Sequence, residues 1–392
     1  MTDVEIGIGR RGRRVYGFEE IALVPSRRTR DPRDVSVGWD IDAYHFDLPV
    51  VASPMDSVMS PRTAIEMSRL GGLGVLNLEG LWTRYDDPTP QLASITGLPE
   101  GASATARLQA LYAEPIREEL VVRRLVELRD AGVTVAASLS PANVVRLAPA
   151  VLAAGVDLFV IQGVVVSAEH VSSGSEPLNL KRFIADLDVP VIVGGSATYM
   201  TTLHLMRTGA AGVLVGVGSG QACTTRGVLG VGMPMASSVV DAASARRDYL
   251  DESGGRYVHV IADGGMRTGG DIAKAIACGA DAVMLGAALA RAAEAPGAGW
   301  HWGMEAAHAE LPRGTRVRVG TSGTLAEVLL GPSHTGDGAT NMIGALRRAL
   351  ATTGNSNLKE LQRVELAVGP SLSTEGKDLQ RAQGVGVGAE VG

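Results

Sequence analysis

Eight short apolar runs, separated by segments with helical periodicity, constrain the fold of this 392-residue chain more than any other feature. The runs are rich in Val, Ile, Leu and Ala, mostly lack polar alternation, and usually end in Gly, Ser, Asp or Asn. This pattern is typical of parallel strands that are buried on both faces. The runs begin at Leu48, Gly72, Val133, Asp157, Val189, Ala211, Tyr257 and Asp281.

The segments between the runs have apolar residues at helical spacing, as in PRTAIEMSRLG, LKRFIADLD, TTLHLMRTGAA and DIAKAIACGA. Parallel strands require crossover connections of this kind, and eight strand–helix units close into a barrel. We therefore predict an α/β fold, a single (β/α)8 TIM barrel domain over residues 1–392. The alternative is a doubly wound open sheet, which needs a GxGxxG loop after an early strand, and VVASPMDS is not such a loop.

Four segments lie outside the minimal barrel. Residues 1–47 are interpreted as an N-terminal arm and lead-in, and residues 82–119 as a long connection after the second strand. Residues 300–345 are expected to form a flap that covers the barrel mouth. The glycine-rich end, residues 380–392, carries no helix or strand signal and is predicted to be disordered.

Composition excludes several classes of function. A formal charge of −6 argues against nucleic-acid binding, and the basic cluster RRGRRV at Arg10–Val15 is interpreted as a solvated arm. Two cysteines are too few for a disulfide framework. No run is long enough to span a membrane, and the first residues carry no apolar signal core. We expect a cytoplasmic protein.

The stretch VGVGSGQACTTR, at residues 215–226, follows the sixth predicted strand and so belongs at the barrel mouth. Its glycines leave backbone amides and carbonyls accessible to a ligand or ion. A free thiol is the most nucleophilic side chain at neutral pH. We interpret Cys223 as reactive rather than as a small core residue, and Cys278, within an amphipathic helix, as core filling.

Three further strand ends carry polar or glycine residues. Asp263 comes directly off the seventh strand in ADGGMRTGGD, where it could accept hydrogen bonds from ribose hydroxyls or only cap a turn. Gly286 ends the eighth strand, and the loops after strands seven and eight are the usual phosphate site of a barrel. In ASPMDSVMS, Ser53 and Ser57 could donate hydrogen bonds and Met55 could supply apolar contact, or all three could be packing and turn residues.

These stretches together resemble the IMP dehydrogenase / GMP reductase family, from GFEEIALVPS to GALRRAL, over residues 17–350. The segments GVGSGQACTTR and IADGGMRTGGDIAKAIACGADAVMLG carry most of the resemblance. The resemblance implies a (β/α)8 barrel, usually a homotetramer, that acts on purine nucleoside monophosphates with NAD or NADP.

The resemblance also implies roles for individual residues. Cys223 corresponds to the nucleophile that attacks carbon 2 of the purine in the dehydrogenases or carbon 6 in the reductases. Thr225 corresponds to the threonine that helps to activate water or ammonia, and Asp263 to the ribose-binding aspartate. The other implied nucleotide contacts are Ser53, Met55, Gly265, Gly286, Gly303 and Met304.

A monovalent cation such as K⁺ is implied at the carbonyl groups of Gly218, Gly220 and Cys223. On the cofactor side, Gln162 stands where the family usually has an aspartate that meets the nicotinamide ribose, and Ser196 stands where it has an asparagine. Both are expected to contact the cofactor.

At the phosphate, Gln221 and Ala287 replace serines of the family pattern and His301 replaces a tyrosine. We expect the phosphate to be held more by backbone amides, with His301 as an additional ligand.

Two departures concern whole segments. Residues 82–135 are too short for the paired regulatory CBS domains of many dehydrogenases, which places the chain in a subgroup that lacks them. The family's flap Arg-Tyr pair is also missing. Glu310 is the predicted general base, acting with Thr225, although it could be an ordinary surface carboxylate, and His308 and Arg313 are near enough in sequence to substitute.

The leading hypothesis is a nicotinamide-dependent oxidoreductase that interconverts IMP and XMP through a covalent adduct at purine carbon 2. A GMP reductase, which converts GMP to IMP and ammonia, is the closest alternative. A nucleotide-binding partner without turnover is an alternative of a different class.

Overall fold

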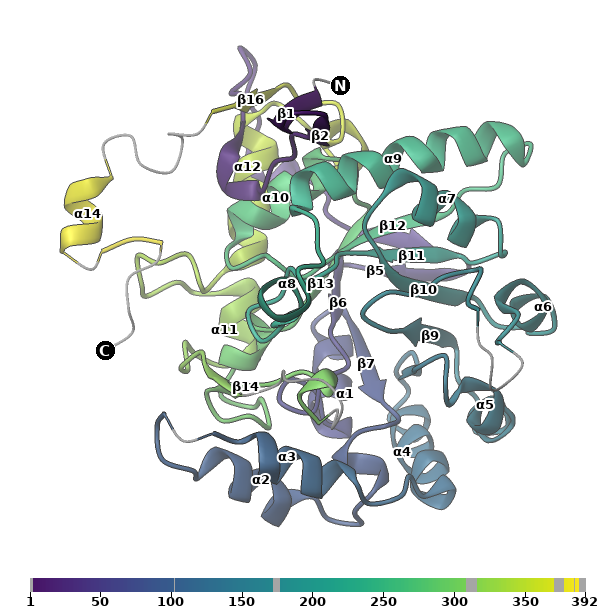
Figure 1. Cartoon of the computed structure of the whole chain (residues 1–392). Coiled ribbons are helices and arrows are strands. Elements are labelled where there is room, and N and C mark those ends of the chain that lie inside the picture. Colours follow the sequence, from purple (N-terminus) through teal and green to yellow (C-terminus); the bar gives the residue numbers. More distant parts are fainter. Residues whose placement is uncertain are drawn as a thin grey trace.

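The computed structural model describes residues 3–101, 103–171, 177–307, 316–369, 377–383 and 385–387. Its centre is a closed barrel of eight parallel strands in the order β10-β11-β12-β13-β6-β7-β8-β9 (Figure 1). The strands are β6 (Val50–Ala52), β7 (Leu73–Asn77), β8 (Ala136–Leu139), β9 (Leu158–Gln162), β10 (Val191–Ser196), β11 (Gly212–Val215), β12 (His259–Asp263) and β13 (Ala282–Leu285).

Each of the eight predicted apolar runs contains one barrel strand, so the barrel prediction is confirmed. The last strand pairs with the first in parallel register, with Val283 opposite Val50 and Leu285 opposite Ala52. That pairing closes the sheet, and the open-sheet alternative is therefore wrong. The strands lack polar alternation because one face packs on the barrel interior and the other on the helices.

Helices surround the barrel and connect successive strands. Hydroxyl side chains start four of the helices named below, because each accepts a hydrogen bond from the third helical amide: Ser60, Thr198, Thr268 and Thr324. The outer helices are α1 (Pro61–Arg69), α4 (Glu118–Asp130), α5 (Val144–Ala153), α6 (Leu180–Ala185), α7 (Tyr199–Met206), α9 (Met235–Glu252), α10 (Gly269–Ala277), α11 (Leu325–Leu330), α12 (Met342–Thr352) and α13 (Leu358–Leu361). Among the described residues, no helix has the length and apolar character needed to cross a bilayer.

The long connection after β7 contains the 3-10 turn η3 (Leu81–Thr83) and the helices α2 (Thr89–Thr96) and α3 (Thr105–Tyr112). Trp302 and Ala306, from the segment after β13, join these helices in a hydrophobic cluster separate from the main core. That segment also contains η4 (Leu289–Arg291), β14 (Trp300–His301) and η5 (Met304–Ala307), and β14 pairs antiparallel with β15 (Val317–Arg318).

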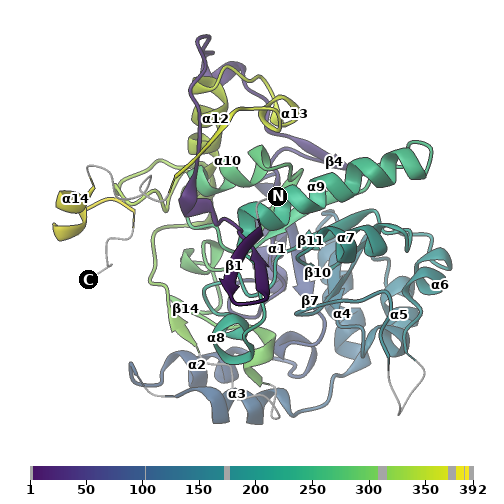
Figure 2. The ribbon, with the colours of Figure 1, turned by 45° about the horizontal axis from the view of Figure 1, so that its top comes forward.

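The short helix α8 (Thr225–Leu229) follows β11, and α9 follows α8. The N-terminal arm forms a hairpin of β1 (Asp3–Gly7) and β2 (Arg10–Arg13), which lies beside α9 (Figure 2). Most of its side chains are exposed, but Arg13 makes two hydrogen bonds, of 2.6 and 2.8 Å, with the carboxylate of Asp241. The basic arm is thus docked on α9 through one of its arginines.

The remaining elements lie between this hairpin and the barrel or near the C-terminus: η1 (Phe18–Glu20), β3 (Ile21–Leu23), η2 (Pro32–Asp34), β4 (Trp39–Ile41), β5 (Tyr44–Phe46), β16 (Leu366–Val368) and α14 (Asp378–Ala382). Strand β16 pairs antiparallel with β3, which joins the two ends of the chain. Helix α14 includes residues 380–382, so the start of the segment expected to be disordered is helical because its backbone amides find partners along the turn. Residues 384 and 388–392 of that segment lie outside the described residues.

A buried charge cluster lies at the end of the barrel where the strands begin. The Asp281 carboxylate accepts hydrogen bonds from Arg246 at 2.6 Å, Lys359 at 2.5 Å and Tyr257 at 2.7 Å. The cations of Arg246 and Lys359 outweigh burial and lower the pKa of Asp281 to about 2. One buried carboxylate therefore connects α9, β12 and the C-terminal helix α13.

Replacing Asp281 by alanine should lower the free energy of unfolding by about 3–5 kcal/mol, because it leaves Arg246 buried without its counter-charge. Urea unfolding followed by circular dichroism measures the change. Glu252→Gln, which breaks the exposed ion pair with Arg207, is the matched control and should leave the midpoint in place. Equal midpoints for the two variants would show that the cluster does not stabilise the barrel.

Candidate active site

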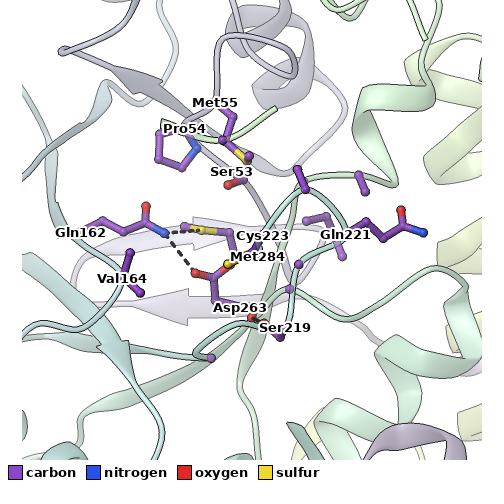
Figure 3. Close-up of a pocket in the computed structure, with 18 of the residues that line it drawn as sticks. Ser53, Pro54, Met55, Gln162, Val164, Ser219, Gln221, Cys223, Asp263 and Met284 are labelled. Atoms are coloured by element: carbon purple, nitrogen blue, oxygen red, sulfur yellow. Dashed lines mark hydrogen bonds between the residues drawn. The ribbon is translucent and has the colours of Figure 1, made fainter. Parts of the chain in front are cut away.

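A cavity of about 450 Å³ opens at the carboxyl ends of the barrel strands. Its lining comes from the loops after several strands, which is where the sequence placed the candidate residues. Figure 3 shows Cys223, Asp263 and Gln162 around this cavity. The predicted site residues that line it are Ser53, Met55, Gln162, Gly218, Gly220, Cys223, Asp263, Gly265, Gly286, His301 and Gly303.

Cys223 lies in the loop between β11 and α8 and is half-buried at the cavity wall. Its Sγ atom donates a hydrogen bond of 3.2 Å to Oγ1 of Thr225, the buried first residue of α8. The second cysteine, Cys278, is packed in the core, where burial raises its thiol pKa to about 12. Only Cys223 therefore combines access to the cavity with a hydroxyl partner.

The cysteine loop is wrapped around the side chain of Arg226. The guanidinium group donates to the carbonyl oxygens of Val217 and Met233. A Cβ atom at Gly218 would lie 2.5 Å from Cγ of Arg226, so this position, with φ of +70°, admits only glycine.

The monovalent cation expected at the carbonyls of Gly218, Gly220 and Cys223 stays a prediction. The Gly220 carbonyl accepts the Cys223 amide at 3.1 Å, and its second lone pair can still coordinate an ion. Among the described residues, no group of three or more His, Cys, Asp or Glu side chains could hold a metal ion. No step proposed below uses a metal.

Asp263 ends β12 and faces the cavity, where Nε2 of Gln162 donates to its Oδ2 atom at 3.0 Å (Figure 3). Burial raises the pKa of Asp263 to about 7, and the charge of Glu305 acts in the same direction. The neutral amide of Gln162 thus bonds to the Asp263 carboxylate, whereas an aspartate at position 162 would put a second negative charge next to Asp263. Gln162 was expected to contact the cofactor, and in the structure it contacts the residue expected to bind the ribose.

The loop after β12 turns sharply against the cysteine loop. Gly265 has φ of +79°, and a Cβ atom at this position would approach Met235 to 3.2 Å. Oγ of Ser219 donates to the Asp263 carbonyl at 2.7 Å and so joins the two loops. Ser219 was not predicted as a site residue, because the serine has no signal apart from its position between two glycines.

His301 reaches the cavity from β14 and is buried, with Nδ1 2.9 Å from Oγ of Ser57. Burial lowers the pKa of His301 to about 4, so the imidazole is neutral near pH 7. A Cβ atom at Gly286 would lie 3.4 Å from this imidazole and 3.4 Å from Sδ of Met55. Three strand ends therefore converge around a space with a bare glycine and an imidazole, at the place where the sequence predicts the phosphate.

Some predicted residues are not brought into the cavity. Ser196 is buried with its hydroxyl 2.8 Å from Oγ1 of Thr202, and it is not among the lining residues. Glu310, together with His308 and Arg313, lies outside the described residues. Met304 is the first residue of η5, and the structure describes its backbone but not its side chain.

The cavity also contains carboxylates that sequence reasoning missed, Glu79 and Glu305 among them. Glu79 accepts hydrogen bonds from the Ser140 amide and from the side-chain amide of Asn143 at 2.9 Å. It stands two residues after the end of β7, a position that could have been identified from the strand end in NLEG. Glu305 directly follows the expected Gly-Met pair.

Comparisons with known proteins agree with this geometry. The sequence model of the IMP dehydrogenase / GMP reductase domain matches residues 15–374. A Mycobacterium tuberculosis protein described as an uncharacterized oxidoreductase is 54% identical over 373 residues, which cover 93% of this chain and 100% of that protein. The inosine-5'-monophosphate dehydrogenase of Methanocaldococcus jannaschii is 27% identical over 476 residues, covering 89% of this chain and 91% of that enzyme.

Among solved structures, an IMP dehydrogenase/GMP reductase-like protein from Corynebacterium glutamicum superposes with a TM-score of 0.89 at 50% identity, covering 93% of this chain and 97% of that one. Between β7 and β8 the described residues form η3 and helices α2, α3 and α4, with no CBS domain. The closed barrel, the strand-end cavity and the match over nearly the whole chain establish that this protein belongs to the IMP dehydrogenase / GMP reductase family of oxidoreductases.

Proposed function

We propose that the protein interconverts IMP and XMP through a covalent adduct between Cys223 and carbon 2 of the purine, with a nicotinamide cofactor as redox partner. The observation that carries the proposal is the thiol–hydroxyl pair of Cys223 and Thr225, 3.2 Å apart, beside a cavity that also contains Asp263. A protein that only bound a nucleotide would have no use for a thiol at this position.

The cavity provides a site for each part of the nucleotide. The ionised Asp263 carboxylate accepts hydrogen bonds from the vicinal ribose hydroxyls. The phosphate binds between the loops that contain Gly265 and Gly286, beside the His301 imidazole. The proposed contacts to the base are Ser53 and Met55 after β6, together with Gly303 and Met304.

In the first half-reaction the Cys223 thiol gives up its proton along the hydrogen bond to Thr225, and the resulting thiolate attacks carbon 2 of IMP. A bound nicotinamide cofactor would supply the acceptor for the hydride of carbon 2. Gln162, Glu79 and Ser138 line the same cavity and offer polar groups to its ribose and carboxamide.

In the second half-reaction water attacks carbon 2 of the adduct, the carbon–sulfur bond breaks, and XMP is released. Thr225, placed next to the sulfur, orients that water and relays its proton to a general base. We keep Glu310 as the proposed base, since the flap is expected to lie over the barrel mouth.

The reaction is tested by incubating the purified protein with IMP, XMP or GMP and either NAD or NADP, oxidised and reduced. We expect IMP and oxidised cofactor to give XMP and reduced cofactor. Turnover of GMP with release of ammonia, and none of IMP or XMP, would instead establish a GMP reductase that uses the same cysteine at carbon 6. Tight nucleotide binding without turnover of any of the three would establish a binding protein.

Cys223→Ser should abolish turnover while nucleotide affinity stays near the wild-type value, because the serine keeps the shape of the site and loses the nucleophile.

Thr225→Ala should lower kcat by about 10²–10⁴-fold, the usual contribution of acid–base catalysis. Rapid mixing should still show a burst of reduced cofactor in Thr225→Ala, because the adduct forms at the normal rate and only its hydrolysis is slowed. A burst that disappears together with kcat would place Thr225 in the first half-reaction instead.

Asp263→Asn should change binding and stability in opposite directions. Loss of the charged acceptor should weaken nucleotide binding by about tenfold or more, as measured by calorimetry. The pKa of Asp263 rises from 3.8 to about 7 on folding, which corresponds to at most about 4 kcal/mol.

The sign of the stability effect follows from that raised pKa. The neutral form is favoured in the folded protein, so the aspartate costs no stability below about pH 4, and its cost grows as the pH rises to about 7. Asp263→Asn should therefore raise Tm at about pH 8 and leave it unchanged at about pH 4. A lower Tm at both values would make Asp263 a structural residue.

A further inference from the structure

A buried hydrogen-bond chain runs behind the cavity and has no role in the chemistry described above. The Tyr112 hydroxyl donates to Oδ2 of Asp56 at 2.5 Å and accepts from Nε1 of Trp302 at 3.1 Å. The Leu81 amide donates to the same Asp56 oxygen at 3.0 Å. The three side chains joined by these hydrogen bonds are almost fully buried, with Asp56 and Trp302 at 1% exposure and Tyr112 at 8%.

The first end of this chain lies in the loop after β6. Asp56 stands between Met55, which lines the cavity, and Ser57, whose hydroxyl is 2.9 Å from Nδ1 of His301. The loop that the Asp56 carboxylate anchors therefore also carries two groups of the proposed nucleotide site.

The second end lies in the segment of residues 300–318, after β13, of which residues 300–307 and 316–318 are described. We call it the covering segment because His301, Gly303 and Glu305 line the cavity. Trp302 stands between His301 and Gly303, and both of these residues line the cavity. The Trp302 carbonyl accepts a hydrogen bond from Oγ of Ser57 at 3.2 Å, so the two walls touch directly as well as through Tyr112. The hydroxyl of Tyr112 thus contacts both sides of the site from behind.

Tyr112 is the last residue of α3, which lies with α2 between β7 and α4 in the long connection after β7. Trp302 and Ala306 pack in the hydrophobic cluster of these helices. Farther along the covering segment, Arg316 donates to carbonyl groups at the end of α2, at 2.8 Å to Ile95 and 2.8 Å to Pro99, and lies 3.7 Å over the Trp300 ring. The described residues on both sides of 308–315 are therefore fixed to this connection.

The Asp56 carboxylate is costly for the protein to keep at this position. Burial raises its pKa to about 6, against the opposing effects of the Tyr112 and Leu81 hydrogen bonds and of the Arg84 charge. Its second oxygen, Oδ1, has no hydrogen-bond partner among the described residues. A buried carboxylate with so few donors contributes little to stability, whereas a network of this kind can select one arrangement of its neighbours.

We infer that Tyr112 is a positioning residue: its hydroxyl holds the loop after β6 and the covering segment at Trp302 in one fixed register. Helices α2 and α3 are then the platform on which the covering segment is placed over the substrate. The inference rests on the proposed function only for the identity of the ligand. The positioning role itself rests on the hydrogen bonds of Tyr112 to Asp56 and Trp302.

The test compares Tyr112→Phe with Tyr85→Phe. Tyr85 packs against the same cluster, and its hydroxyl donates to the Leu111 carbonyl at 3.0 Å, so each variant loses a tyrosine hydroxyl from the same platform. Only Tyr112 contacts the walls of the site. We expect Tyr112→Phe to weaken IMP binding and to lower kcat/KM by about tenfold, the size of one buried hydrogen bond to a charged group, and Tyr85→Phe to match wild type.

Hydrogen exchange of the backbone amides of residues 300–307, measured without ligand, is the second readout. It should accelerate in Tyr112→Phe and not in Tyr85→Phe. A Trp302→Phe variant breaks the chain at its other end, and its effect on IMP affinity should combine with that of Tyr112→Phe less than additively.

The two readouts separate this inference from the proposed function. Wild-type protein that binds no purine nucleotide would sink the proposed function, and the exchange measurement would still decide whether Tyr112 holds the covering segment. Equal exchange and equal affinity in Tyr112→Phe and Tyr85→Phe would overturn the positioning role. Additive effects of Tyr112→Phe and Trp302→Phe would do the same.

Discussion

Closure of the barrel between its last and first strands is the constraint on which the site depends. Leu285 of β13 pairs with Ala52 of β6, and the Ser53 amide donates to the Leu285 carbonyl at 3.0 Å. This pairing puts Gly286 next to Met55, although the two residues come from opposite ends of the barrel sequence. Without closure, the proposed phosphate loop and the loop after β6 would lie at opposite edges of a sheet and could not share one cavity.

The two ends of the barrel use buried carboxylates in opposite ways. Asp281, where the strands begin, is surrounded by cations that lower its pKa to about 2, and its charge stabilises the fold. Asp263, where β12 ends, has only a neutral amide as its side-chain partner, and burial raises its pKa to about 7. A carboxylate that is left uncompensated at a cavity is available to a ligand, at some cost to stability. This contrast separates the structural end of the barrel from the end that carries chemistry.

The sequence was sufficient to predict the eight strands because burial on both faces leaves a run without polar alternation. It also predicted that Cys223 and Asp263 lie at the barrel mouth, where both line the cavity, because the strand ends and the loops after them form this mouth. Ser196 shows the limit of that rule: it is the last residue of β10, but its hydroxyl is bonded to Thr202 inside the protein. The contact between Tyr112 and Trp302 spans 190 positions and has no local signal, so only the packed structure reveals it.

The proposed reaction, which runs through a covalent adduct, would place two demands on the covering segment. It must exclude water while hydride leaves, and it must then admit one water to the same carbon. A cover that was rigid throughout would fail the second demand, and a cover that was free throughout would fail the first. In this chain Trp302 and Arg316, which lie on either side of residues 308–315, are both hydrogen-bonded to the connection after β7. That connection, which has no CBS domain among its described residues, therefore contacts the walls of the candidate site directly.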